Sequence, residues 1–78
     1  MEVILKCKLL DLKEIKIKKG ENAGKYFYIG NFYDGENLFK IAISEENKND
    51  IEKYIGKEMS ILIFVKLDSA KLYFKEIA

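Results

Sequence analysis

Residues 25–43 read KYFYIGNFYDGENLFKIAI and predict a β-hairpin that organises the rest of the chain. Aromatic and β-branched residues favour strands, and they are dense in Lys25–Phe32 and Leu38–Ile43. Between these two segments, Asp34-Gly35 followed by Glu36-Asn37 is a strong signal for a tight turn. The two segments therefore predict consecutive strands that are joined directly.

One strand is expected before this hairpin. In Glu2–Leu12, apolar residues alternate with lysines, which is the period-two pattern of a half-buried strand. The alternation resumes at Ile15 and Ile17 and stops at the turn-forming run 20–24. Cys7 falls on the apolar side, so we interpret it as a buried small hydrophobe, with a reactive thiol as the alternative.

The segment after the hairpin changes period. Within residues 44–56, apolar side chains recur at helical spacing at Ile51, Tyr54 and Ile55. Asn49 or Asp50 can cap the start of a helix, and Gly56 can end it. We therefore expect a short helix of about two turns.

Two more strands are expected at the end of the chain. One has an apolar face made of Met59, Ile61, Ile63, Val65 and Leu67, and Leu72–Ile77 follows it after a turn at Asp68-Ser69. Five short strands with one helix between the third and fourth predict a mainly β, single OB-fold domain spanning residues 1–78, a five-stranded barrel with the helix at one end. An SH3-like barrel, which lacks that helix as a regular feature, is the alternative.

The composition argues against most catalytic chemistry. The 78 residues include one cysteine and no histidine, so no Cys/His zinc site can form. No nucleophile and base stand at a recognised spacing, and the glycine motifs that bind phosphates or dinucleotides are missing. We predict a binding protein, not an enzyme, without a cofactor or metal.

Charge and hydropathy give weaker indications. The formal net charge is +1, but residues 1–33 carry seven lysines against four acidic residues, whereas residues 34–58 carry four lysines against seven. Such polarity suits a polyanionic ligand if the charges separate by face. No apolar run approaches the length of about 18 residues that crosses a bilayer, and we predict a cytoplasmic protein with no membrane contact.

The side chains that suggest a function are aromatic residues interleaved with lysine. If Phe27 and Ile29 point into the barrel together with Phe39, Ile41 and Ile43, alternation sends the other rings of the second strand outward. Bases stack on exposed rings, and ammonium groups contact phosphates. The predicted nucleic-acid-binding residues are Lys16, Lys18, Lys19, Lys25, Tyr26, Tyr28, Phe32, Lys40, Lys66 and Tyr73.

Structural explanations stand beside this interpretation. Tyr26 and Tyr28 can pack on neighbouring side chains, as amphipathic strand tyrosines often do. The lysines at positions 16, 18 and 19 can simply keep an edge strand from pairing with another sheet. A slip of one residue in the second strand would also bury these tyrosines and expose Phe27 and Ile29.

The chain resembles the small single-stranded DNA-binding proteins of phages, in particular the filamentous-phage gene V protein class. The resemblance covers nearly the whole chain, including a basic loop ending in Gly24-Lys25-Tyr26 and an acidic helical connection ending in Tyr54-Ile55-Gly56. It implies a dimeric OB-fold that coats single-stranded DNA cooperatively during replication. By position, it assigns the basic loop to Lys16, Lys18 and Lys19, and base stacking to Tyr26 and Tyr28.

One segment departs from that family. The tip of the final hairpin is Leu67-Asp68-Ser69-Ala70, whereas the family has a longer, glycine-rich tip with an aromatic residue. This departure bears on cooperative contacts between dimers and on the dimer itself.

The sequence as a whole predicts a homodimeric, sequence-nonspecific single-stranded DNA-binding protein of phage or mobile-element type, active in replication or recombination. A protein-interaction or accessory-subunit module is the alternative. Single-stranded RNA binding is another, and it differs physically only in contacts to the 2′-hydroxyl.

Overall fold

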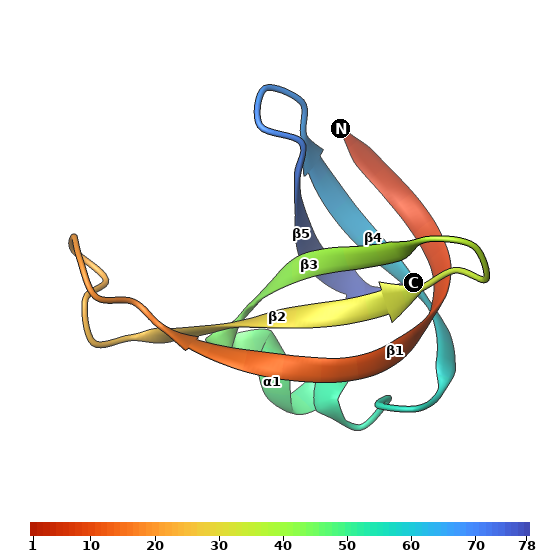
Figure 1. Cartoon of the computed structure of the whole chain (residues 1–78), viewed down its shortest axis with the longest axis horizontal. Coiled ribbons are helices and arrows are strands. Elements are labelled where there is room, and N and C mark those ends of the chain that lie inside the picture. The colour runs from red at the N-terminus through yellow and green to blue at the C-terminus, as the bar shows by residue number, and fades with distance from the viewer.

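Five strands close into a barrel in the order β1-β2-β3-β5-β4 (Figure 1). This computed structural model describes all 78 residues. The elements are β1 (Glu2–Lys16), β2 (Tyr26–Tyr33), β3 (Leu38–Ser44), α1 (Glu45–Glu52), β4 (Glu58–Lys66) and β5 (Lys71–Ile77). The predicted OB-fold barrel, with one short helix between the third and fourth strands, is confirmed.

Strand β1 is long enough to pair with two neighbouring strands, one along each half of its length. Residues 2–8 pair with β4, and residues 8–16 pair with β2. The register shifts between Leu9 and Asp11, and this irregularity changes which alternate positions face the core. Cys7 is 4% exposed, which confirms its interpretation as a buried hydrophobe. The strand runs to Lys16, four residues beyond its predicted end.

The turn between β2 and β3 forms where the sequence predicts it. Oδ1 of Asp34 accepts hydrogen bonds from the backbone N–H groups of Glu36 and Asn37, at 2.8 and 2.7 Å. These two bonds hold the pKa of the Asp34 carboxyl below its usual value. Gly35 has a φ of 105°, which side-chain-bearing residues rarely adopt. The Asp-Gly pair therefore fixes the hairpin locally.

The helix starts earlier than expected. Ser44, rather than Asn49 or Asp50, is the N-cap, and the eight-residue helix begins at Glu45. Acidic residues in its first turn suit the positive end of the helix dipole, which explains the earlier start. Ile51 is completely buried and anchors the helix to the core of the barrel. No helix in the protein is long and apolar enough to cross a bilayer.

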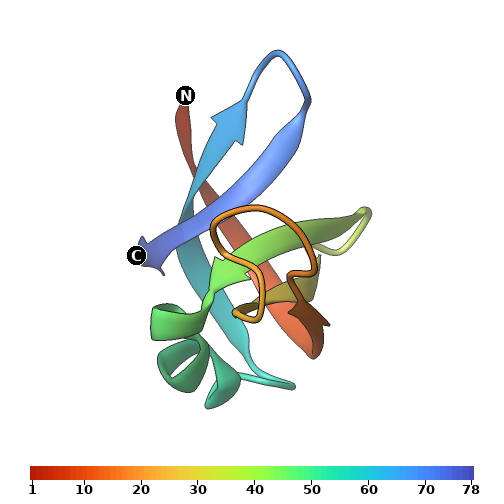
Figure 2. The same ribbon diagram turned by 90° about the vertical axis from the view of Figure 1, so that its left-hand side faces the viewer.

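The last two strands close the barrel. β4 and β5 form an antiparallel hairpin, whereas β5 meets β3 in parallel through one register pair, Ala42 with Tyr73. Leu67 was expected on the apolar face of β4, but it lies in the turn and is 73% exposed. That expectation is wrong because β4 ends at Lys66. Figure 2 looks toward the β1–β2 loop, with the β4–β5 loop above it.

The core is a single cluster of eleven buried hydrophobic residues. It comprises Cys7, Leu9, Tyr28, Phe32, Ile41, Ile43, Ile51, Met59, Ile61, Ile63 and Phe74. The predicted inward faces of β3 and β4 are largely confirmed, since Ile41, Ile43, Met59, Ile61 and Ile63 all belong to it. Phe39 is half-buried and packs against its margin.

The predicted facing of β2 is wrong. Phe32 is completely buried and Tyr28 is 8% exposed, whereas Phe27 and Ile29 are only half-buried and lie on the outer side. A Cβ atom on Gly30 would lie 2.5 Å from Cε1 of Phe32, so the missing side chain leaves room for the inner ring. The register of β2 is therefore one residue away from the expected one.

The amide of Asn31 supports the observed facing. Asn31 alternates with Phe27 and Ile29, so turning those residues inward would carry a polar amide into the core. On the outer side, Nδ2 of Asn31 donates a hydrogen bond to Oδ1 of Asp11 at 2.5 Å. The observed register gives the Nδ2 group of Asn31 a polar partner, whereas its Oδ1 atom is buried without a hydrogen bond.

Candidate nucleic-acid interface

The outer face of the barrel carries a row of side chains that crosses four strands. Lys13 pairs with Ile29, Ile29 pairs with Ala42, and Ala42 pairs with Tyr73. Paired residues in neighbouring strands share a face, so these four side chains lie side by side. The neighbouring rows pair Phe27 with Ser44 on one side and Asn31 with Lys40 on the other.

A groove of about 790 Å³ lies over this face. Ten of its thirteen lining residues are hydrophobic, and they come from β2, β3, β5 and the β4–β5 loop. We name it the β2–β3–β5 groove and define it by Phe27, Ile29, Lys40, Ala42, Lys71 and Tyr73.

The groove is hollow because two strands diverge. β3 and β5 share only the Ala42–Tyr73 pair, so the rest of each strand's facing edge is not paired across the gap. Ala42 also brings a single methyl group to the middle of the row, between Ile29 and Tyr73. An open edge and a small central side chain together leave room for a ligand.

Lysines are the only charged residues that line the groove. Because β5 runs parallel to β3, Lys40 and Lys71 each lie two residues before the Ala42–Tyr73 pair and on the same face. Neither takes part in an ion pair, since the two ion pairs of the protein join Lys48 to Glu52 and Lys75 to Glu2. The groove therefore offers two uncompensated ammonium groups to an anion.

A third lysine adds to this charge. Lys66 pairs directly with Lys71 across the β4–β5 hairpin. Like charges opposite one another destabilise a hairpin, and an anion bound beside them would remove that cost. Lys66 does not line the groove, but it lies next to Lys71, one of its lining lysines.

Two aromatic rings of the groove, Phe27 and Tyr73, lie on the outer face of the barrel. Tyr73 is 37% exposed, and Phe27 is half-buried. The alternation in β5 predicts that Tyr73 faces outward, and its exposure confirms this facing. Phe27 is missed, because it was expected in the core. The sequence does hold a signal for this facing. Phe27 and Asn31 lie on the same face of the strand, and a polar Asn31 marks that face as the outer one.

The basic loop and Tyr26 border a second hollow of about 510 Å³ between the β1–β2 loop and the start of α1. Lys25 and Tyr26 line it, and it shares Phe27 and Ser44 with the β2–β3–β5 groove. Its lining also includes Glu45 and Glu46, so its charge is mixed. The remaining predicted lysines, Lys16, Lys18 and Lys19, are exposed at or near this loop.

Tyr28 and Phe32 do not reach this surface. The Tyr28 hydroxyl donates a hydrogen bond to Oε2 of Glu14 at 3.2 Å, and Nζ of Lys48 lies 5.7 Å from the centre of its ring. Burial, followed by the bond to Glu14, raises the pKa of Tyr28. These contacts tie α1 and β1 to β2, so both rings have structural roles.

The thiol of Cys7 is likewise part of the core. Burial, with a smaller contribution from Asp34, raises its pKa to about 11. A thiol with such a pKa is almost entirely protonated near neutral pH and is a poor nucleophile. The protein also has no group of three or more His, Cys, Asp or Glu side chains arranged to hold a metal ion.

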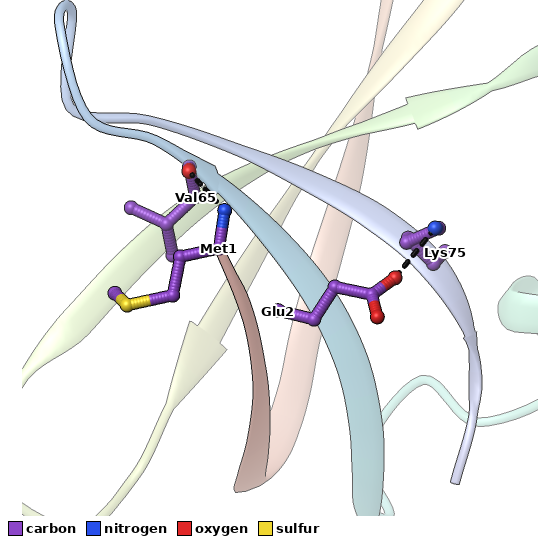
Figure 3. A network of polar contacts seen from close by, with 4 residues as sticks. All are labelled: Met1, Glu2, Val65 and Lys75. Carbon is purple, nitrogen blue, oxygen red and sulfur yellow. Dashed lines mark hydrogen bonds and ion pairs between the residues drawn. The ribbon is translucent and has the colours of Figure 1, made fainter.

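A different surface lies where β4 is flanked by β1 and β5. Nζ of Lys75 lies 2.6 Å from Oε2 of Glu2, and the N-terminal amine donates to the carbonyl oxygen of Val65 at 3.2 Å (Figure 3). The ion pair lowers the pKa of Glu2 and raises that of Lys75. Lys75 is therefore neutralised by a neighbour, unlike Lys40 and Lys71.

Comparisons of the chain with protein-family models, with curated proteins and with solved structures find no significant match. The chemistry of the β2–β3–β5 groove is accordingly inferred from its own residues.

Proposed function

We propose that the β2–β3–β5 groove binds single-stranded DNA with little sequence preference. One observation carries the proposal. A largely apolar groove with one exposed ring, Tyr73, and one half-buried ring, Phe27, has two lysines as its only charged lining residues, and neither lysine is in an ion pair. Flat rings beside cationic side chains are the combination that single-stranded nucleic acids require.

In this proposal, the bases stack on Phe27 and Tyr73 while Lys40, Lys66 and Lys71 contact phosphates. Stacking on an aromatic side chain contributes about 1–3 kcal/mol per base and accepts any base, because every base has a flat face. The lining contains no carboxylate or amide that could read a base edge. Recognition therefore depends on stacking and charge, which explains the low sequence preference.

The same geometry disfavours duplex DNA. In a duplex, both faces of each base are covered by adjacent bases. The rings of the groove can therefore stack only on bases that are already unpaired.

A second candidate is an extended apolar peptide, favoured by the hydrophobic character of ten of the thirteen lining residues. The response to salt separates the two ligands. Binding to nucleic acid weakens steeply as salt rises, because counterions are released from the phosphates. Binding of an apolar peptide has no such dependence.

The test is a fluorescence-anisotropy titration of labelled oligo-dT at several salt concentrations. Each phosphate contact to a single strand contributes about 0.7 to the slope of log K against log salt. We expect the Lys40→Ala/Lys71→Ala variant to bind more weakly and to lose about 1.4 from the magnitude of this slope, which corresponds to two contacts.

The matched control removes the same charge outside the groove. Lys6→Ala/Lys8→Ala changes two exposed lysines of β1 that do not line the groove, and its slope should remain close to that of the unaltered protein. Equal losses in the two variants would point to unspecific attraction by net charge. Absence of binding to any oligonucleotide would favour the peptide instead.

A further inference from the structure

The floor of the groove is aliphatic at the point where bases would lie. Ile29 and Ala42 are register partners, and both are half-buried rather than covered by other side chains. Phe27 precedes Ile29 by two residues on the same face of β2, and Tyr73 is the register partner of Ala42. A base stacked on either ring therefore lies close to methyl and methylene groups.

An aliphatic floor distinguishes thymine from uracil. The two bases have the same Watson–Crick edge and differ in the 5-methyl group of thymine, which proteins read through apolar contacts. Burying one methyl-sized group against apolar atoms contributes about 0.8 kcal/mol, which is roughly a fourfold change in affinity. With uracil, the same position leaves a gap or admits water.

We infer that the groove prefers thymine-bearing single-stranded DNA over uracil-bearing strands, with Ile29 and Ala42 contacting the 5-methyl group. This inference rests on the proposed function and adds a base preference to it. The preference is set by shape and hydrophobic contact, so it is compatible with the absence of base-edge hydrogen bonding.

The 2′-hydroxyl of RNA acts in the same direction. Ten of the thirteen residues that line the groove are hydrophobic, and the other three are Lys40, Ser44 and Lys71. A ribose hydroxyl turned toward the aliphatic floor would lose water without gaining a partner. RNA thus lacks the favourable methyl group and adds a polar group, so DNA is the expected ligand.

The experiment compares oligo-dT with oligo-dU of equal length in the anisotropy assay. Sugar, phosphate and charge are identical, so the ratio of the two affinities isolates the methyl group. We expect oligo-dT to bind at least about fourfold more tightly, with the same dependence on salt. Oligo-rU should bind no more tightly than oligo-dU.

Two matched variants test the assigned contact. Ile29→Thr keeps a β-branched side chain but introduces a hydroxyl, and it should reduce the dT/dU ratio toward one. Ile4→Thr makes the same change at a 66% exposed site of β1 outside the groove, and the ratio should not change. Should Ile29→Thr fail to fold by circular dichroism, Ala42→Ser examines the same floor.

The outcomes separate this inference from the proposed function. Equal binding of oligo-dT and oligo-dU would overturn the thymine preference and leave single-strand binding intact. An unchanged ratio in Ile29→Thr and Ala42→Ser would overturn the assigned contact. Tighter binding of oligo-rU than of oligo-dT would overturn the preference for DNA, and no binding to any of the three would overturn both proposals.

Discussion

The inner and outer faces of β2 carry similar side chains but lie in different surroundings. Tyr28 and Phe32 point inward and are buried, whereas Phe27 and Ile29 point outward and line an open groove. Hydrophobicity alone does not distinguish the two faces, because each has an aromatic ring. The difference arises from what lies opposite each face: a filled core on one side, and the gap between β3 and β5 on the other.

Under the proposed function, this difference separates the residues of β2 that stabilise the fold from those that bind the ligand. The inner face is fixed by shape, since the ring of Phe32 occupies the space that a side chain on Gly30 would need. On the outer face, Phe27 is only half-buried and lines the open groove. Substitutions on the inner face should therefore change the free energy of unfolding, and those on the outer face should change affinity for the ligand.

The largest expected effect is that of Phe32→Ala. Removing a completely buried phenylalanine leaves a cavity and costs about 3–5 kcal/mol, a large part of the total for a domain of this size. We expect urea denaturation followed by circular dichroism to show a protein that is largely unfolded or unfolds at much lower urea. Phe27→Ala, on the outer face, should unfold close to the unaltered protein and bind oligo-dT more weakly.

Two other results would contradict the assignment of Phe32 to the core and of Phe27 to the binding surface. If Phe27→Ala unfolded as easily as Phe32→Ala, then both rings would belong to the core and the groove would lack its stacking surface. If Phe27→Ala were stable and bound oligo-dT normally, the ring would have no part in binding.

Gly30→Ala is expected to have the next largest effect. The added Cβ would lie 2.5 Å from Cε1 of Phe32 and 3.0 Å from Cδ1 of Ile43, so the core must shift. Overpacking of this kind costs about 1–3 kcal/mol, which exceeds the gain of about 0.4–1 kcal/mol from restricting the unfolded chain. Urea denaturation of the variant should show the net loss.

A double-mutant cycle sharpens this prediction. In Gly30→Ala/Phe32→Leu, the smaller side chain makes room for the new methyl group, so the two changes together should destabilise less than the sum of the single effects. Strictly additive effects would mean that the two positions do not share the space that the structure gives them.

The strands were predictable wherever one face is polar. Lysines alternate with apolar residues in the first part of β1, so its pattern gives both the strand and its inward side, including Cys7. The turn at Asp34-Gly35 was predictable for a different reason, because its conformation depends on local hydrogen bonds and a positive φ. Together with the position of the helix, these signals were enough to predict the fold.

The candidate site was predictable only in part. Lys40 and Tyr73 lie on strands with clear alternation, and they line the groove. Phe27 was missed because both faces of β2 are apolar, and a shift of one residue then leaves the pattern almost unchanged. The hollow itself depends on the single Ala42–Tyr73 pair, a contact between distant parts of the chain that no local pattern indicates.

The smallest expected effect concerns the Tyr28 hydroxyl, at the end of the inner face. Burial and the bond to Glu14 raise the pKa of Tyr28 above its ordinary value of 10.0. The folded state therefore holds this proton more tightly than the unfolded state does. The contribution of this group to the free energy of unfolding is fully present below about pH 10, and it is lost as pH rises through the pKa of the folded state. Tyr28→Phe should weaken this alkaline dependence, measured as urea midpoints between about pH 9 and 11. Ultraviolet titration should lose one tyrosine that ionises above the ordinary pKa of 10.0. An unchanged profile would mean that the hydroxyl of Tyr28 meets water rather than Glu14, and that the inner face ends before this residue.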